Sequence, residues 1–147
     1  MDSGLVYLVQ TDTTVGFLSS YDEKLSTIKK RPIKQKTLQV VDSFKTLKEN
    51  CRVPKKQKNF VRRSKLTTFI YPNSLSFRVV SNQSHHYRFI KKFQKLYSTS
   101  ANITKQNFDE KFAKNCSDVV LYNNIGFNET KSSSIFKLNN NSIKKIR

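Results

Sequence analysis

Short strand-like runs alternate with short helix-like runs along this chain, and this alternation is the feature that most constrains its fold. Strands are predicted where β-branched and aromatic residues cluster, at 4–10, 37–41, 66–71, 74–80, 97–102, 118–124, 133–138 and 142–147. Helices are predicted where apolar residues recur at helical spacing or follow a capping residue, at 23–31, 44–50, 85–96 and 108–115. Such a mixture predicts an α/β fold with helices packed on a mixed sheet.

Several details of this prediction can be tested against a structure. Asp22 is expected to cap the first helix and Pro32 to stop it, while Asp42 or Ser43 caps the second. The residues at 72–74 form a turn signal, so the strands on either side are expected to be an antiparallel pair. The basic, apolar-poor segment 52–65 is expected to be a loop.

One further helix is predicted in detail because its apolar residues are so regular. Phe89, Ile90, Phe93 and Leu96 are expected to share the apolar face of the helix at 85–96, with lysines outward.

The length of 147 residues fits one domain that is large enough to bury a core. No segment approaches the roughly 18 apolar residues that are needed to span a bilayer. The second residue is acidic, where a signal peptide would be basic. We therefore expect a cytoplasmic protein without a membrane partner.

The net charge is strongly positive, with 28 lysines and arginines against 10 acidic residues, a formal charge of +18. Such an excess favours a polyanionic partner, although a solvated basic surface gives the same composition. The 3 glycines are too few for a glycine-rich phosphate loop.

Metal and carboxylate chemistry find little support in the sequence. His85 and His86 are adjacent, so on a helix they point about 100° apart and cannot serve one metal; both are expected at the surface. Cys51 and Cys116 have no nearby cysteine or histidine partner, so neither a zinc site nor a disulfide framework is predicted. The remaining candidates, the carboxylates, are scattered without a dyad pattern: Asp12, Asp22, Glu23, Asp109, Glu110 and Asp118.

Cationic and hydroxyl-bearing stretches remain after these exclusions. They are KKRP at 29–32, Arg78 inside a strand, STSAN at 98–102 and KSSS at 131–134. Arginine presents a planar fork to phosphate oxygens, lysine adds a point charge, and small hydroxyl residues leave backbone N–H groups accessible. These stretches together favour a site for a phosphate-bearing ligand.

Taken in order, the stretches TDTTVGF, IKKRP, FRVV, STSAN and SSIFKL with IKKIR resemble the threonylcarbamoyl-AMP synthase family of the YrdC or TsaC type. The resemblance covers essentially the whole chain and implies a single YrdC-like domain over residues 1–147. In that fold a twisted mixed β-sheet with flanking helices curves around a concave basic cavity. The family condenses L-threonine, bicarbonate and ATP with Mg²⁺ into threonylcarbamoyl-AMP and pyrophosphate for tRNA modification, without a tightly bound cofactor or a structural metal.

The resemblance also assigns roles to ten residues. Lys29 and Arg31 match K-x-R and are expected to be catalytic and to face the triphosphate. ATP is expected to contact Lys29, Arg31, Ser100, Asn102 and Arg147. Threonine is expected to contact Thr11, Thr13, Arg78, Ser98 and Ser133.

The sequence departs from the family pattern at Gln10, Val15, Val80 and Lys137, and RSKLT at 63–67 replaces P-G-P-x-T. Either Gln35 or Lys36 takes the next polar position after the K-x-R motif.

The sequence is compatible with three functions. The first is the enzyme, which would pass its product to downstream threonylcarbamoyl-transferase proteins. The second is a non-catalytic module of the same fold that binds tRNA or double-stranded RNA. The third is a carbamoyl-transfer module like that of hydrogenase maturation factors, for which the sequence lacks the additional acylphosphatase and zinc-finger regions.

Overall fold

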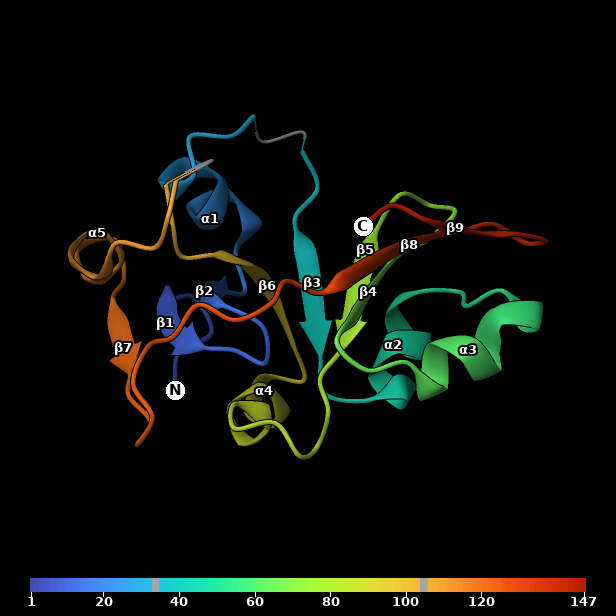
Figure 1. Cartoon of the computed structure of the whole chain (residues 1–147), viewed down its shortest axis with the longest axis horizontal. Helices are drawn as coiled ribbons and strands as arrows, with labels where there is room; N and C mark the ends of the chain where they lie inside the picture. The colour runs from blue at the N-terminus through green and yellow to red at the C-terminus, as the bar shows by residue number, and fades with distance from the viewer. Residues whose placement is uncertain (33–34, 104–105) are drawn as a thin grey trace.

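A computed structural model of the protein describes residues 1–32, 35–103 and 106–147 (Figure 1). The described residues form one sheet of nine strands in the order β7-β1-β2-β6-β3-β5-β4-β8-β9. The strands are β1 (Tyr7–Gln10), β2 (Val15–Ser19), β3 (Leu38–Val41), β4 (Thr67–Ile70), β5 (Ser76–Val79), β6 (Lys95–Ser100), β7 (Val119–Leu121), β8 (Ser134–Leu138) and β9 (Ile143–Lys145). The helices are α1 (Asp22–Ile28), α2 (Phe44–Asn50), η1 (Lys55–Gln57), α3 (Lys58–Arg63), α4 (Tyr87–Phe93) and α5 (Glu110–Asn115).

The sheet is mixed, as predicted. Strand β7 pairs parallel with β1, β5 with β3, and β8 with β4, whereas the other neighbours are antiparallel. The predicted hairpin is confirmed because β4 and β5 pair antiparallel across the turn at 72–74. The expected α/β class is therefore correct.

Helix α4 covers only half of one sheet face. Phe89 and Ile90 of α4 pack on Tyr7, Leu18 and Leu96, which lie on three neighbouring strands. Side chains two residues apart on a strand share a face, so Ser98 and Ser100 of β6 follow Leu96 on this same face. Helix α4 does not cover them, and the uncovered half is where the sheet turns polar.

The opposite face is packed by helices at both ends. Leu25 of α1 and Ala113 of α5 pack against Leu8 and Phe17 of β1 and β2. Farther along the sheet, Leu47 of α2 and Val61 of α3 pack with residues of β3, β4 and β5: Val41, Phe69 and Phe77. The fold is thus anchored on one face and keeps part of the other face free for a site.

Three predictions about the helices are wrong, one of them that the first helix reaches Arg31 and is stopped by Pro32, because α1 ends at Ile28 and Lys30 takes a positive φ of 50°. Segment 52–65 is largely helical, because Val61 is buried and Phe60 stacks edge-on against Phe69 and Phe136 in spite of the surrounding charges. Helix α1 begins at Asp22 itself, with Tyr21 as its N-cap and no side-chain capping bond. The second helix is capped by Ser43, whose side chain accepts a hydrogen bond from the Thr46 amide.

One additional strand and one strand boundary also differ from the prediction. Strand β2 was not predicted, because all five of its residues are buried and show no alternation of polar and apolar side chains. Leu96 belongs to β6 rather than to the preceding helix, since that helix ends at Phe93 and Gln94 takes a positive φ of 65°. Within the three described stretches, no helix is long and apolar enough to cross a membrane.

Candidate active site

The uncovered half of the sheet face forms a cavity of about 250 Å³. Its walls come from β2, β3, β5 and β6, the β1–β2 turn and the segments before β8 and after β9. Every predicted site residue except Lys29 and Asn102 lines it: Thr11, Thr13, Arg31, Arg78, Ser98, Ser100, Ser133 and Arg147. The structure therefore brings together residues that are up to 136 positions apart in the sequence, from Thr11 to Arg147 (147 − 11).

The turn between β1 and β2 is fixed by threonine hydroxyls. Thr11 Oγ1 donates a hydrogen bond of 2.6 Å to the Thr14 carbonyl and accepts the amides of Thr13 and Thr14 at 3.2 Å. These bonds hold the buried Thr13 side chain against the cavity. Thr14 also lines the cavity, although the sequence analysis did not single it out.

Arg78 enters the cavity from the middle of the sheet and is almost fully buried. Its Nη1 donates a hydrogen bond of 3.0 Å to Thr13 Oγ1, and its Nη2 lies 3.6 Å from Asp12 Oδ1. Burial lowers the pKa of Arg78, and the Asp12 carboxylate opposes that shift. The guanidinium is therefore oriented from two sides at the cavity wall.

Asp12 is a site residue that sequence reasoning missed. It was grouped with the scattered carboxylates, yet it is one of two partners of a buried ion pair with Arg78, with side chains 4% and 7% exposed. Its place in the sequence could have identified it, because Asp12 lies between Thr11 and Thr13, two residues that were expected in the site. A buried charge requires a partner, so Asp12 and Arg78 depend on each other.

Two further arginines reach the cavity from other elements. Arg31, after the end of α1, donates a hydrogen bond of 3.0 Å from Nη2 to the buried Thr37 hydroxyl. Arg147 donates from Nε to the Ser133 carbonyl at 3.1 Å, and the Ser133 hydroxyl lies 3.1 Å from Thr68 Oγ1. Thr37 and Thr68, which hold these groups, were also not predicted.

Lys29 lies behind the end of β6 rather than in the cavity. Its Nζ donates to the Ser100 carbonyl at 3.1 Å, to the Asn102 carbonyl, and to Asn102 Oδ1 at 2.9 Å. Ser100 Oγ donates to the same Oδ1 at 2.7 Å. Lys29 therefore fixes the STSAN segment, and its expected contact with a triphosphate stays a prediction.

Asn102 lines a neighbouring cavity of about 240 Å³ that shares Thr14, Ser100 and Ser132 with the first. Ser98 lines only the first cavity and Asn102 only the neighbouring one, whereas Ser100 lines both. Together the two spaces offer room for an elongated ligand along the end of β6.

The pKa of Lys29 is lowered from 10.5 to about 8, mainly by burial and secondly by the charge of Arg31. The unfolded chain keeps this proton up to about pH 10.5, whereas the folded chain releases it near pH 8. The free energy of unfolding should therefore rise between pH 8 and 10.5 relative to Lys29→Met, which cannot titrate there, and the difference should be flat below pH 8. Urea unfolding of both proteins across this range measures it, and parallel curves would contradict the expectation.

The two histidines differ in their surroundings. His85 is exposed as expected, but His86 is buried, and burial lowers its pKa to about 4. The prediction that both lie at the surface is therefore wrong for His86, which is the N-cap residue of α4.

Gln35 and Lys36 are both exposed, and neither lines the cavity. Lys36 Nζ donates a hydrogen bond to the Asn73 carbonyl instead.

Groups that could bind a metal are not gathered at the site. Among residues 1–32, 35–103 and 106–147, no cluster of three or more histidine, cysteine, aspartate or glutamate residues is present. Cys51 is buried, Cys116 is half-buried, and both are free thiols.

The chemistry of the cavity is that of an anion site. Three guanidinium groups, those of Arg31, Arg78 and Arg147, line it together with hydroxyls, and no carboxylate does so within the described part of the chain. Guanidinium groups make charge-assisted hydrogen bonds with carboxylates and phosphates. The arrangement therefore suits a ligand, or a pair of ligands, with several negative charges.

Comparison with known families and structures gives a consistent result. The Sua5_yciO_yrdC family model, described as "Telomere recombination", matches residues 1–147. No curated protein matches the sequence. Among solved structures, Escherichia coli YciO is 14% identical with a TM-score of 0.77, covering 98% of this chain and 82% of that one.

Two further solved structures are of Sua5 from P. abyssi. A doubly substituted Sua5 is 13% identical, with a TM-score of 0.82, and Sua5 complexed with L-threonine is 15% identical, with a TM-score of 0.79. Both alignments cover 98% of this chain but only 52% and 50% of the Sua5 chains, so this chain spans about half the length of those relatives. A part of HypF in a phosphate- and nucleotide-bound form also matches, at 17% identity over 98% of this chain and 27% of HypF, with a TM-score of 0.74. These likenesses establish a shared fold.

Proposed function

The chain belongs to the Sua5/YciO/YrdC family, and from this premise we propose that it is an L-threonylcarbamoyladenylate synthase. It would condense L-threonine, bicarbonate and ATP into threonylcarbamoyl-AMP and pyrophosphate, for delivery to transferase proteins that modify tRNA. The observation that carries the proposal is the cavity lined by Arg31, Arg78 and Arg147 together with threonine and serine hydroxyls. The solved Sua5 relative with L-threonine and the HypF relative with phosphate and nucleotide support this choice of ligands.

The chemistry requires positioning more than a protein nucleophile. The threonine amine forms an N–C bond with the carbon of bicarbonate, and a C–O bond of bicarbonate breaks with loss of water, which leaves a carbamate. A carbamate oxygen then attacks the α-phosphorus of ATP while the bond to pyrophosphate breaks. Negative charge shifts onto the α-phosphate oxygens and the departing pyrophosphate during this step. Fixed cations that face those oxygens lower the barrier, and holding both substrates in one cavity lowers it further.

Each part of the cavity then has a task. Arg78, held by Thr13 and Asp12, would bind the carboxylate of threonine. Arg31 and Arg147, which line the cavity, would bind phosphate groups, and Mg²⁺ would enter with ATP as part of the substrate. Lys29 would act as a positioning residue through its bonds to Ser100 and Asn102.

The proposal is tested by incubating the protein with MgATP, ¹⁴C-bicarbonate and L-threonine. Labelled threonylcarbamoyl-AMP and an equal amount of pyrophosphate should form, and omission of bicarbonate or threonine should abolish both. Replacing threonine with 2-aminobutyrate, which lacks the hydroxyl, provides a matched substrate control. Failure to form product under conditions in which a full-length Sua5 is active would reject the enzyme proposal.

A second candidate function is RNA binding without catalysis, and the composition of η1 and α3 favours it. These two short helices expose Lys55, Lys56, Lys58, Arg62 and Arg63 on one stretch of the chain. Such a surface would bind double-stranded RNA or tRNA with a steep dependence on salt. RNA affinity that falls on Lys58→Gln and Arg62→Gln substitution but not on Arg31→Gln substitution would support this function.

A further inference from the structure

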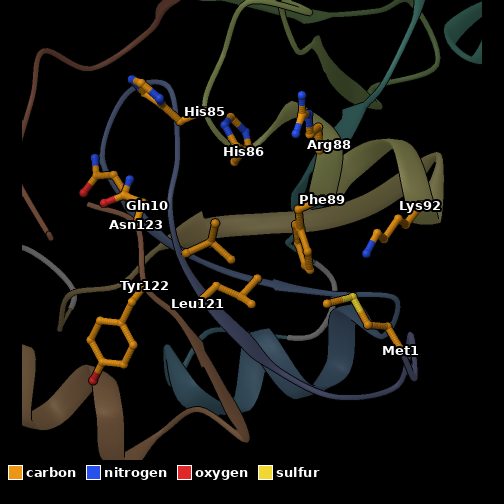
Figure 2. Close-up of a pocket in the computed structure, with 11 residues that line it drawn as sticks. Met1, Gln10, His85, His86, Arg88, Phe89, Lys92, Leu121, Tyr122 and Asn123 are labelled. Carbon is orange, nitrogen blue, oxygen red and sulfur yellow. The ribbon is translucent and has the colours of Figure 1, made fainter. Parts of the chain in front are cut away.

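A third cavity, of about 230 Å³, lies beside α4 (Figure 2). It lies between α4, the residues just before it, the ends of β1 and β7, and Met1. Gln10 lines this cavity and is the sequence neighbour of Thr11, which lines the first cavity, but the two cavities share no lining residue. This cavity beside α4 therefore requires its own explanation.

The floor of this cavity is apolar. Val9 of β1 and Phe89 of α4 are buried, and Leu121 of β7 is half-buried beside them. Because Val9 and Phe89 belong to the core under α4, the floor is built on rigid elements. A floor of this kind favours the apolar or aromatic body of a ligand.

The rim is cationic. Arg88 and Lys92 are both exposed and lie four residues apart, on the same side of α4. Neither has an ion-pair partner among the described residues, in which the ion pairs are Arg78–Asp12 and Lys114–Glu110. No aspartate or glutamate is among the residues that line the cavity, so the charge of the rim is uncompensated.

His86 adds a polar group without a partner. Figure 2 shows His85, His86 and Arg88 along one side of the cavity, across from Leu121. His86 is 4% exposed, and its Nδ1 lies 2.8 Å from Ser84 Oγ, while its Nε2 has no hydrogen-bond partner among the described residues. A buried polar atom without a partner lowers stability, and a polar group supplied by a ligand would satisfy it.

From the apolar floor, the cationic rim and the unpartnered His86 Nε2, we propose that this cavity binds a small anion with an apolar or aromatic body. The ligand would lay its body on Val9, Phe89 and Leu121 and direct its carboxylate or phosphate to Arg88 and Lys92, with one of its oxygens accepting a hydrogen bond from His86 Nε2. The cavity is smaller than the roughly 300–1,000 Å³ of drug-sized sites, so a single ring or a short chain fits best. This site is separate from the proposed threonine and ATP site and does not depend on it.

Binding is tested with three probes that separate charge from apolar body: 3-phenylpropionate, its uncharged amide, and inorganic phosphate. Titration of the ¹⁵N-labelled protein should shift the amide signals of Phe89, Leu121 and Tyr122 with 3-phenylpropionate. The amide and inorganic phosphate should each bind at least tenfold more weakly. Equal affinity for the uncharged amide, or for phosphate alone, would overturn the proposal.

A matched pair of variants on α4 tests the rim. Arg88→Gln with Lys92→Gln should weaken 3-phenylpropionate binding at least tenfold, whereas Lys91→Gln removes an equally exposed charge that does not line the cavity and should change affinity less than twofold. All three substituted residues are exposed, so both variants should fold. Shifts that appear at Ser98 and Ser133 instead of Phe89 and Leu121 would place the probe in the first cavity and reject the proposal.

Discussion

Replacement of Arg78 with glutamine should lower kcat/KM for threonine by at least about 100-fold. Charge-assisted hydrogen bonds contribute roughly 1.5–3 kcal/mol each, and a bound carboxylate would lose two of them. The same substitution should lower the free energy of unfolding by about 3 kcal/mol, because it leaves the buried Asp12 carboxylate without its cation. Threonine-dependent pyrophosphate release and urea unfolding measure the two effects.

A double variant separates the two roles of Arg78. Asp12→Asn combined with Arg78→Gln removes both charges of the buried pair, so more than half of the lost stability should return. Activity should not return, since the threonine carboxylate still lacks its guanidinium. If the stable double variant regained activity, Arg78 would act only on the fold and the proposed carboxylate contact would be wrong.

The sequence predicted the elements that carry periodic patterns or turn signals. The hairpin around the turn at 72–74 and helix α4 were recognised because their patterns are strong. Strand β2 was missed because both of its faces are buried, so it lacks the alternation that marks a half-buried strand. Helix α3 was missed because its charged residues hide one apolar face, formed by Phe60 and Val61, that packs only in the tertiary structure.

The candidate site was predictable to a similar extent. Motif order identified residues that the structure does bring to one cavity, such as Arg31, Arg78 and Ser133. The residues that hold these side chains could not be found from motif order. Thr37, just before β3, and Thr68, within β4, are buried single hydroxyl residues that belong to no motif. The direction of the Lys29 side chain, toward Ser100 and Asn102 at the end of β6 and not into the cavity, could not be predicted from the motif.

The second large effect is expected at Arg31. Its Nη2 bond to Thr37 orients the guanidinium, and its Nε has no hydrogen-bond partner among the described residues, so the group retains donors for a phosphate. Arg31→Gln should lower kcat/KM for ATP about 100- to 1,000-fold, the usual loss when one charge-stabilising donor is removed. Arg31→Lys should recover only part of this, because an ammonium group cannot make two parallel hydrogen bonds to phosphate oxygens.

Thr37→Val is the matched control for Arg31, since it removes only the orienting hydroxyl and keeps the guanidinium. Thr37→Val should lower kcat/KM for ATP by about tenfold or less, because it removes one ordinary hydrogen bond. The KM for threonine should stay within twofold in both variants, whereas Arg78→Gln should raise it. If Arg31→Gln instead raised the KM for threonine and left ATP unaffected, the two ends of the cavity would have to exchange their assigned substrates.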